Sequence, residues 1–424
     1  MTGTGSRAAP RKGQVAWCLY DWANSAFPTV ILTFVFSAYF TQAVAADPVA
    51  GTALWGWGIS LSALGVAVLS PVLGAIADRT GARKPWIFVF TVLCVLASAA
   101  LWQVEPDTAF ILLALVLVGV ANAAFEFAMV FYNAMLPGLA GPGRIGRLSG
   151  YGWGLGYIGG LAALVVVLLG FVQTDTPLFG LSKDAAEHVR VTGPLVAVWM
   201  AVFAVPLFLF TPDRAATKLP VGQAVRAGVG DLIATIRRVR DHATVARFLL
   251  ARMIYTDGLN TLFAFGGIYA AGTFGMAFEE LIIFGIVLNV TAGLGAAVFA
   301  PLDDRIGPKK TIIIAVLGLT LLGGALLVVE GKTMFWVFGA PLGLFVGPAQ
   351  AASRSMMAHL APPHLRTEMF GLYALSGKAT AFLGPALLGW VAAVTDSQRL
   401  GMATILVFFV VGLWLLRPVP DARA

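Results

Sequence analysis

The sequence predicts an all-α membrane protein in which twelve transmembrane helices form two pseudo-symmetric six-helix bundles. Three observations lead to this fold class. The 424 residues are 59% hydrophobic and only 12% charged, whereas a typical soluble domain has about 25% charged residues. Apolar stretches of about 18 or more residues, long enough to cross a bilayer as helices, occur twelve times. The motifs of the first half of the chain also return in the second half.

The twelve stretches follow one another with short polar connections. They are 15–44, 53–77, 86–103, 109–132, 149–171, 190–211, 246–272, 278–301, 311–329, 333–358, 370–395 and 400–416. A longer polar segment separates the sixth stretch from the seventh. We therefore expect an N-terminal bundle over residues 1–211, a linker with a surface-lying amphipathic helix over 212–246, and a C-terminal bundle over 247–424.

The distribution of basic residues predicts the orientation of the chain. If the N-terminus is cytoplasmic, 21 of the 28 Lys and Arg residues lie on the inside and four on the outside, with three inside spans. Both termini are therefore expected in the cytoplasm, because positive residues concentrate on that side of a membrane. The net charge of +7 follows from the basic residues on the inside, which are placed to contact anionic lipid headgroups. The charge therefore does not indicate nucleic-acid binding.

Internal repeats connect the two halves. After the second span the chain reads Gly74-x-x-x-Asp78-Arg79-x-Gly81-x-Arg83-Lys84, and 226 positions later it reads Ala300-x-x-x-Asp304-Arg305-x-Gly307-x-Lys309-Lys310. The first span carries Asp21-x-x-Asn24-Ser25-x-Phe27, which returns 236 positions later as Asp257-x-x-Asn260-Thr261-x-Phe263. The fourth and tenth spans align at an offset of 224, and the fifth and eleventh at 221. Such duplication is typical of secondary transporters.

The doubled turn resembles the major facilitator superfamily, and the likeness extends over the whole chain. Three segments resemble its vacuolar effluxer branch, the autophagy-related group: Tyr20 to Ala26 (YDWANSA), Gly347 to Ser355 (GPAQAASRS), and Phe370 to Tyr373 (FGLY). The resemblance implies the major facilitator fold, with the first, fourth, seventh and tenth spans around a central cavity. Because fungal members of this branch are described as exporting amino acids from the vacuole, it also implies an amino-acid substrate.

Polar residues collect on those four spans, where each needs a partner, water or a function. The candidate substrate or proton site consists of Asp21, Asn24, Asn122, Glu126, Arg252, Asp257, Asn260, Gln350 and Arg354, with Tyr20 and Trp22 as aromatic candidates. Most of these residues lie three or four positions apart in pairs, so each pair shares one face of its helix. The alternative is that they only satisfy one another as interhelical hydrogen bonds.

Roles within this site follow from charge. Asp21 and Asp257 are expected to recognise an ammonium group or to bind the coupling proton, and Asn24 and Asn260 to hydrogen-bond the substrate. Arg252 and Asp257 are five positions apart and cannot pair on one helix face. We therefore expect Glu126 to pair with Arg252 or Arg354 across the two halves. Lys378, a lone cation in the eleventh span, is a second-tier candidate.

The doubled turns are expected to form a cytoplasmic gate. Its residues are Asp78, Arg79, Gly81 and Arg83 in one half and Asp304, Arg305, Gly307 and Lys309 in the other. Each aspartate ends a helix, where the helix dipole disfavours an anion. We expect nearby basic residues, or the N-termini of the eleventh and fifth spans in the opposite half, to compensate these charges.

The sequence predicts a secondary transporter and not an enzyme. Its four histidines show no metal-ligand spacing, and no cofactor or catalytic motif is recognisable. The expected function is efflux of a small organic solute, first an amino acid, by alternating access with a proton as candidate coupling ion. The alternatives are a proton-linked drug or sugar exporter and a membrane receptor without transport activity. We expect a multi-pass monomer in the lipid bilayer, in the inner or plasma membrane if the source is bacterial.

Overall fold

The computed structural model describes residues 8–141, 143–217, 221–237 and 239–421, and these residues form helices and turns without a strand. The first long helix is continuous over Arg11–Val44. It consists of α1 (Arg11–Asn24), the π-helical η1 (Phe27–Phe34), α2 (Phe36–Tyr39) and the π-helical η2 (Phe40–Val44). Pro28 lies at the start of η1, where it cannot donate a backbone hydrogen bond, so the change of helical pitch there has a local cause.

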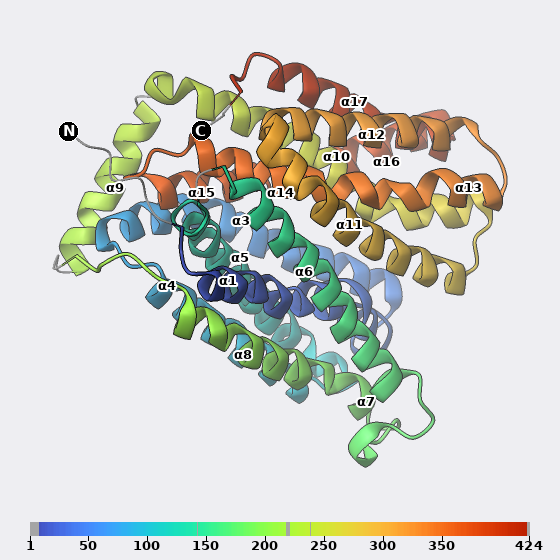
Figure 1. The fold of residues 1–424 in the computed structure, drawn as a ribbon. Helices are drawn as coiled ribbons and strands as arrows, with labels where there is room; N and C mark the ends of the chain where they lie inside the picture. The colour runs from blue at the N-terminus through green and yellow to red at the C-terminus, as the bar shows by residue number, and fades with distance from the viewer. Residues whose placement is uncertain (1–7, 142, 218–220, 238, 422–424) are drawn as a thin grey trace, which may run out of the picture.

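The remaining helices of the first half pack beside one another as one bundle (Figure 1). They are α3 (Pro48–Thr80), α4 (Lys84–Ala100) with η3 (Leu101–Gln103), η4 (Thr108–Phe110) with α5 (Ile111–Leu139), α6 (Ile145–Val167) with η5 (Leu168–Val172), η6 (Leu178–Gly180), α7 (Glu187–Arg190) and α8 (Thr192–Phe210). The turn between α3 and α4 requires Gly81, whose φ of 82° is accessible to glycine at little cost.

The second half repeats this arrangement. Its helices are α10 (Ala243–Phe274), α11 (Phe278–Ile306), α12 (Pro308–Val328), α13 (Lys332–Gly339) with η8 (Ala340–Leu342) and α14 (Gly343–Leu360), α15 (Arg366–Ser376), α16 (Leu383–Thr395) and α17 (Gln398–Leu416). Gly307, the repeat partner of Gly81, also has a positive φ, of 92°. The tight turns predicted from the doubled motif are therefore present in both halves.

Ten helices of the described chain are long and apolar enough to cross a membrane. The expected spans 246–272 and 370–395 are not among them. The first of these corresponds to α10, a helix of 32 residues that carries several polar side chains. The second is interrupted between α15 and α16, so its apolar part is only Leu383–Thr395. Large apolar side chains such as Leu61, Leu112 and Trp414 are exposed on the outer surface, as expected for contact with lipid.

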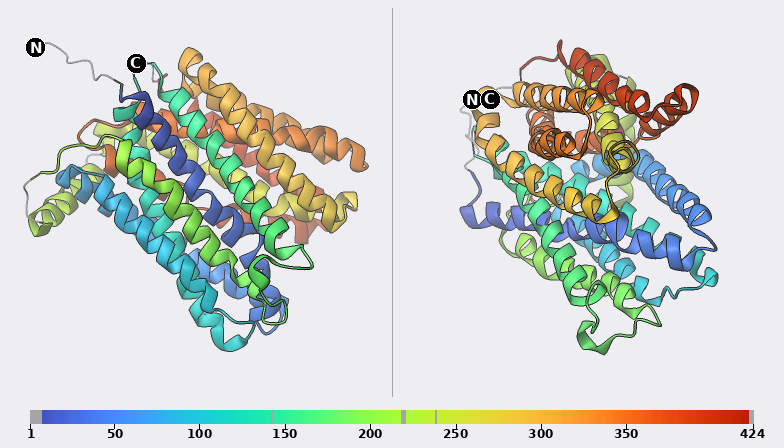
Figure 2. Two further views of the ribbon diagram at one scale, coloured as in Figure 1. Left: turned by 60° about the horizontal axis from the view of Figure 1, so that its bottom comes forward. Right: turned by 90° about the vertical axis from the view of Figure 1, so that its right-hand side faces the viewer.

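The linker lies at one end of the molecule. It includes α9 (Val221–Arg237) and η7 (Val239–His242), while residues 218–220 and 238 of the predicted linker lie outside the described residues. The start of α1 and the end of α17 lie at the same end as α9 (Figures 1 and 2), which we call the linker end. Because α9 packs against α3, with Gly228 against the backbone of Ile76, it is a contact element of the bundle.

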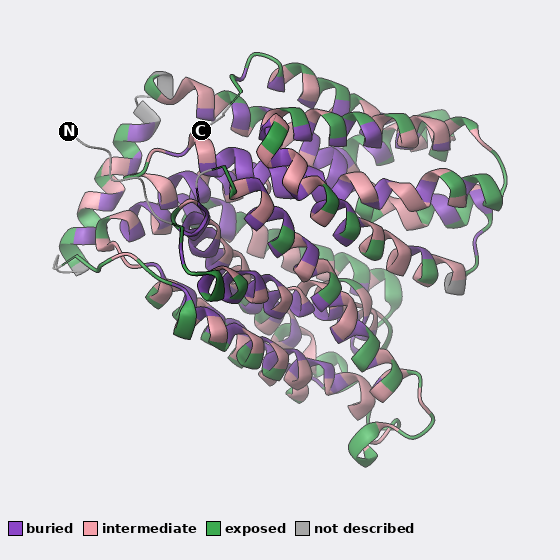
Figure 3. Ribbon diagram, viewed as in Figure 1, coloured by how far each residue is buried: buried purple, intermediate pink, exposed green. Residues whose placement is uncertain are grey.

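Two repeat-related helix pairs join the halves, α6 with α11 and α3 with α15. Small residues allow both approaches: a Cβ on Gly150 would meet Ala296 and Ala300 of α11, and one on Gly371 would meet the backbone of Ser70 in α3. Close packing at small residues is a common way for membrane helices to associate. Burial is concentrated where these helices meet, and the outer faces are exposed (Figure 3).

Candidate functional site

Arg252 of α10 binds the end of α15, where the helix is interrupted before α16. Its guanidinium donates to the carbonyl oxygen of Tyr373 and to Ser376 Oγ, both at 2.7 Å, and stacks 3.5 Å from the centroid of the Tyr373 ring. A cation is favourable at a helix C-terminus because the last carbonyl groups are unsatisfied. Arg252 therefore stabilises the end of α15 and the non-helical segment 377–382 that follows it.

An ion pair connects the halves beside this segment. Lys378 Nζ lies 2.7 Å from Glu126 Oε1 of α5, and the two side chains are 30% and 19% exposed. By helical rise Glu126 lies about 20 Å from the linker end of α5, near the middle of a hydrocarbon core of about 30 Å. The expectation that Glu126 pairs with Arg252 or Arg354 is wrong. Glu126 pairs with Lys378, whereas Arg252 binds Tyr373 and Arg354 binds Asp21. Lys378, a second-tier candidate from the sequence, is thus the residue that makes this contact.

A second cross-half contact occupies the repeat-related positions. Tyr157 of α6 donates to Gln350 Oε1 of α14 at 2.5 Å. At the offset of 224 Gln350 corresponds to Glu126, and at the offset of 221 Tyr157 corresponds to Lys378. Repeat-related positions therefore form two contacts between the halves. Glu126 and Lys378 form an ion pair, and Gln350 and Tyr157 form a neutral hydrogen bond.

Arg354 of α14 makes the most deeply buried contact between the halves. Its Nη1 atom lies 3.0 Å from Asp21 Oδ2, and the side chains are 1% and 6% exposed. The guanidinium also donates to Asn133 Oδ1 at 3.2 Å, to Ser149 Oγ at 3.0 Å and to the Ser149 carbonyl oxygen at 2.6 Å. The ring of Trp17 lies 4.9 Å from it. Such a set of partners compensates the cost of desolvating both charges.

Asp257, the repeat partner of Asp21, has a different environment. It is fully buried in α10, and neither carboxylate oxygen has a hydrogen-bond partner among the described residues. Thr380 of the 377–382 segment lies near this carboxylate, and its hydroxyl oxygen is also buried without a hydrogen-bond partner among the described residues. Burying an unpaired carboxylate costs at least a few kcal/mol.

The other sequence candidates do not converge on one cavity. Asn24 donates to Met129 Sδ at 3.1 Å and Asn122 to Ser62 Oγ at 2.9 Å, both within the first half. Asn260 is exposed. For Asn24 and Asn122 the alternative stated above, interhelical hydrogen bonding, describes the contacts seen here.

The two aromatic candidates also pack within the first half. The Tyr20 hydroxyl is 2.7 Å from Thr91 Oγ1, and the Tyr20 ring packs against Tyr132. Trp22 stacks on Trp199 with ring centroids 5.7 Å apart. All of these contacts lie within the first half, so they give no evidence for the two rings as parts of a substrate site.

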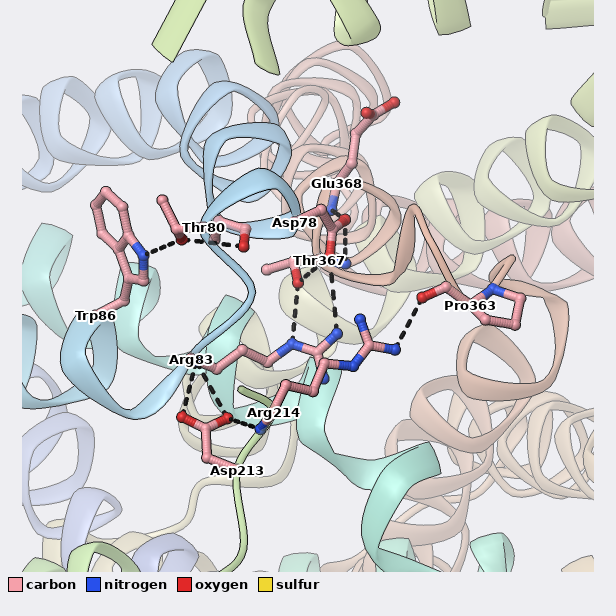
Figure 4. A network of polar contacts seen from close by, with 10 residues as sticks. Asp78, Thr80, Arg83, Trp86, Asp213, Arg214, Pro363, Thr367 and Glu368 are labelled. Atoms are coloured by element: carbon pink, nitrogen blue, oxygen red, sulfur yellow. Dashed lines mark hydrogen bonds and ion pairs between the residues drawn. The ribbon is translucent and has the colours of Figure 1, made fainter. Parts of the chain in front are cut away.

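The predicted gate contacts are present in the first half (Figure 4). Asp78 at the end of α3 accepts hydrogen bonds from the backbone N–H groups of Thr367 and Glu368 at 2.8 and 2.9 Å, and from Thr367 Oγ1 at 2.7 Å. Arg83 lies 3.7 Å from Asp78 and donates to Thr367 Oγ1. Burial lowers the pKa of Arg83 to about 10, and the positive charge of Arg214 acts in the same direction.

The second half shows the repeat-related contact. Asp304 at the end of α11 accepts from the backbone N–H groups of Gly146 and Arg147 at 2.8 and 3.3 Å, at the start of α6. Arg147 Nε is 3.0 Å from its other carboxylate oxygen. The prediction that the N-termini of the opposite half compensate these aspartates is confirmed in both halves.

The other gate candidates contact the linker and the chain end. Arg79 pairs with Asp231 of α9, Lys309 donates to the Arg417 carbonyl oxygen at 2.8 Å, and Arg305 is exposed. The linker itself reaches both halves: Asp213 accepts from the backbone N–H groups of Arg83 and Lys84, and Arg214 donates to the Pro363 carbonyl oxygen. The linker therefore joins the gate contacts.

Several site residues were missed by sequence reasoning. Ser149 and Asn133 bind Arg354, Tyr157 pairs with Gln350, and Thr367 binds Asp78. Tyr157 had a usable signal, because it aligns with Lys378 in the repeat. Ser149, Asn133 and Thr367 are ordinary helix residues whose role depends on a partner from the other half. No group of three or more metal-ligating side chains occurs in the described part of the chain.

Comparison with known proteins identifies relatives over the whole length. A family model described as "Vacuole effluxer Atg22 like" matches residues 48–146 and 143–424. An "Uncharacterized MFS-type transporter YxiO" from Bacillus subtilis is 29% identical over 97% of this chain and 95% of its own. "Autophagy-related protein 22" from Cryptococcus neoformans is 25% identical over 65% of this chain, which spans about half of that fungal protein.

Solved structures share the fold. The major facilitator superfamily transporter FucP, in the outward conformation, has a TM-score of 0.76 at 15% identity, with 97% of this chain and 98% of that chain covered. The proton:xylose symporter XylE has a TM-score of 0.73 at 14% identity, with 97% and 96% covered. At these identities the likeness establishes the architecture alone.

Proposed function

The chain belongs to the vacuole effluxer Atg22-like family of major facilitator superfamily transporters, and from this premise we propose that it exports an amino acid by alternating access. The single observation that carries the substrate class is the pair of Glu126 and Lys378. An α-amino acid presents an ammonium and a carboxylate group a few ångströms apart. One substrate molecule can therefore replace the ion pair, with its ammonium at Glu126 and its carboxylate at Lys378.

The position of this pair supports a role in substrate binding. It lies between the halves, near mid-membrane, and both side chains are partly exposed. Lys378 belongs to the segment that interrupts the eleventh predicted span, and discontinuous helices are a frequent feature of transporter binding sites. A zwitterionic substrate supplies both an ammonium and a carboxylate group, so opening the pair for it leaves neither Glu126 nor Lys378 without an opposite charge.

Alternating access is proposed from the contacts on the linker side of this pair. Arg354 with Asp21, and the two gate aspartates with the opposite helix N-termini, hold the halves together toward the linker end. Rocking one half against the other breaks these contacts and opens the site to that side. We propose that this end is cytoplasmic and that twelve spans cross the membrane, with α10 as the seventh and α15 with α16 as the eleventh.

Further parts of the proposal concern the assembly. Residues 1–211 and 247–424 act as the two moving bundles, and 212–246 connects them. The transporter works as a monomer in the cell membrane, without a cofactor, and is driven by an ion gradient. The substrate site consists of Glu126 and Lys378. The repeat-related hydrogen bond between Tyr157 and Gln350 lies outside it.

Counterflow in proteoliposomes tests the substrate class. Leucine, its decarboxylated analogue 3-methylbutylamine and its deaminated analogue 4-methylpentanoate compete for uptake of labelled leucine, together with a sugar panel. Each lost charge-assisted hydrogen bond removes about 1.5–3 kcal/mol, so the two analogues should compete at least about tenfold more weakly than leucine. Equal competition by either analogue contradicts a zwitterion site, and competition by sugars alone favours the sugar exporter.

Variants locate the site within the same experiment. Lys378→Met and Glu126→Gln should each abolish leucine counterflow while leaving thermal unfolding nearly unchanged, because the pair is partly exposed. Tyr157→Phe is the matched control, because it removes the repeat-related hydrogen bond to Gln350 and leaves the ion pair in place. This variant should prefer leucine over both analogues, as the parent chain does. Undiminished counterflow in Lys378→Met removes the pair from substrate binding.

A further inference from the structure

Asp257 and Thr380 form a buried polar pair that the substrate site does not use. Asp257 is fully buried, and the Asp257 carboxylate oxygens and Thr380 Oγ1 all lack a hydrogen-bond partner among the described residues. Asp257 comes from the middle of α10, about 21 Å from its start by helical rise. Thr380 comes from the segment between α15 and α16. A carboxylate at this depth requires a neutralising partner.

The described charged side chains around α10 are directed at other groups. Arg252 of α10 is directed at Tyr373 and Ser376, Lys378 at Glu126, and Arg354 of α14 at Asp21. The neighbouring helix α17 contributes Arg399, which donates to the carbonyl oxygens of Leu327 and Val329, and α16 contains no charged residue. Among the described side chains, the acidic and basic groups of α11 and α13 are Glu280, which pairs with Lys332, and Asp303, Asp304 and Arg305 at the linker end. Those of α15 are Arg366 and Glu368 in its first turn, also at the linker end.

We propose that Asp257 and Thr380 hold a small monovalent cation, Na⁺ or a proton. Either cation supplies the missing positive charge. Na⁺ binds oxygen ligands, which the carboxylate, the hydroxyl and the backbone carbonyl groups of an interrupted helix can provide. A proton neutralises the carboxyl group directly. The site is separate from the Glu126 and Lys378 pair and lies on the side of the 377–382 segment that faces α10.

The position of Thr380 links this site to the substrate site. Thr380 and Lys378 are two residues apart in the same short segment. A cation held between Asp257 and Thr380 fixes that segment and with it the position of Lys378 against Glu126. Binding of the cation and binding of the substrate therefore influence each other reciprocally. This coupling step rests on the proposed function, whereas the cation site does not.

Thermal unfolding of the purified full chain in detergent tests the cation site. NaCl is compared with N-methylglucamine chloride at constant ionic strength, at pH 8 and pH 5.5. A sodium site gives an increase in Tm of about 2 °C or more with NaCl at pH 8. A proton site gives no response to Na⁺ but a greater gain in Tm from pH 8 to pH 5.5 in the parent chain than in Asp257→Asn.

Variants assign the response to these residues. Asp257→Asn should lose the response to the cation, and Thr380→Val should weaken it at least severalfold, which keeps the test valid if Asp257→Asn does not fold. Asp303→Asn is the matched control: Asp303 is also buried, with one carboxylate oxygen lacking a partner, and this variant should retain the response. Absence of any response in the parent chain, or an equal response in Asp257→Asn, overturns the proposal.

Leucine counterflow separates the two proposals. If the cation response depends on Asp257 but no amino acid is transported, the cation site stands and the proposed substrate fails. If leucine is transported and the parent chain responds to neither cation, the cation site fails and the substrate proposal stands. When both hold, Asp257→Asn should make leucine binding independent of the cation.

Discussion

Asp21 and Asp257 occupy the same position in the two repeats and have opposite environments. Asp21 faces the Arg354 guanidinium at 3.0 Å, whereas Asp257 is buried without a hydrogen-bond partner among the described residues. The motif around them is nearly identical, Asp-x-x-Asn followed by Ser or Thr. The difference shows that a repeated motif specifies a repeated helix face, and that the opposite half decides what each face contacts.

The cause of the difference lies in the helices that surround each aspartate. At the offset of 224, the position of Arg354 corresponds to Val130 in the first half. The residues that hold Arg354, Asn133 and Ser149, correspond to Met357 and Phe370 in the second half. Met357 and Phe370 are buried and apolar. Asp257 therefore lacks both the arginine, because the first half has Val130 at that position, and the polar pocket that would hold it.

The largest expected effect comes from removing Arg354. Arg354→Leu leaves Asp21 as an unpaired buried charge and deprives Asn133 and Ser149 of a donor. Breaking a buried ion pair from one side costs about 3–5 kcal/mol, so thermal unfolding in detergent should occur at a clearly lower temperature. The double variant Asp21→Leu with Arg354→Leu should recover part of this loss. A single variant as stable as the parent chain would mean that Arg354 does not fasten the halves.

The gate aspartates give the next largest effect and test the same asymmetry at the linker end. Asp78 accepts three hydrogen bonds from α15, two of them from backbone N–H groups. Asp304 accepts two backbone N–H bonds, one of them at 3.3 Å, and its ion-pair partner Arg147 is 40% exposed. Charge-assisted hydrogen bonds contribute about 1.5–3 kcal/mol each in favourable cases.

Asp78→Asn should therefore open the linker side more than Asp304→Asn does. The measurement is the labelling rate of a cysteine at Ser355, which is buried in α14 next to Arg354, by a water-soluble maleimide in each background. Both variants should label faster than the cysteine variant alone, with Asp78→Asn faster by at least about threefold. The reverse order would show that the number of backbone donors does not set the strength of the gate.

Features that depend on local sequence were predictable. Hydropathy gave the positions of the helices, and the doubled turn gave both gate aspartates with their helix N-terminal partners. The requirement for glycine at 81 and 307 followed from the same turn. In each case the physical cause, a run of apolar residues or a positive φ, acts within a few residues of the chain.

Features that depend on how the halves face each other were not predictable. Glu126 binds Lys378 rather than an arginine, because the rotation of each helix about its own axis decides which side chains meet. The interruption after Ser376 has no proline within 377–382 and depends on Arg252, which comes from α10. Tyr20, an aromatic candidate from the sequence, is fully buried and packs against the ring of Tyr132.

The smallest expected loss of stability, and the sharpest contrast with Arg354, comes from Asp257→Asn. The amide keeps the shape of the side chain and removes a charge that has no ion-pair partner in the described chain. Because replacing a poorly compensated buried charge by a neutral group is often neutral or stabilising by about 1–4 kcal/mol, the free energy of unfolding should stay equal or rise within that range when measured without Na⁺ at pH 8. Asp21→Asn under the same conditions should be destabilising, because it weakens the only carboxylate contact that the structure gives to Arg354. If both variants lose stability equally, Asp257 has an ionic partner in solution, and the two repeat-related aspartates are equivalent after all.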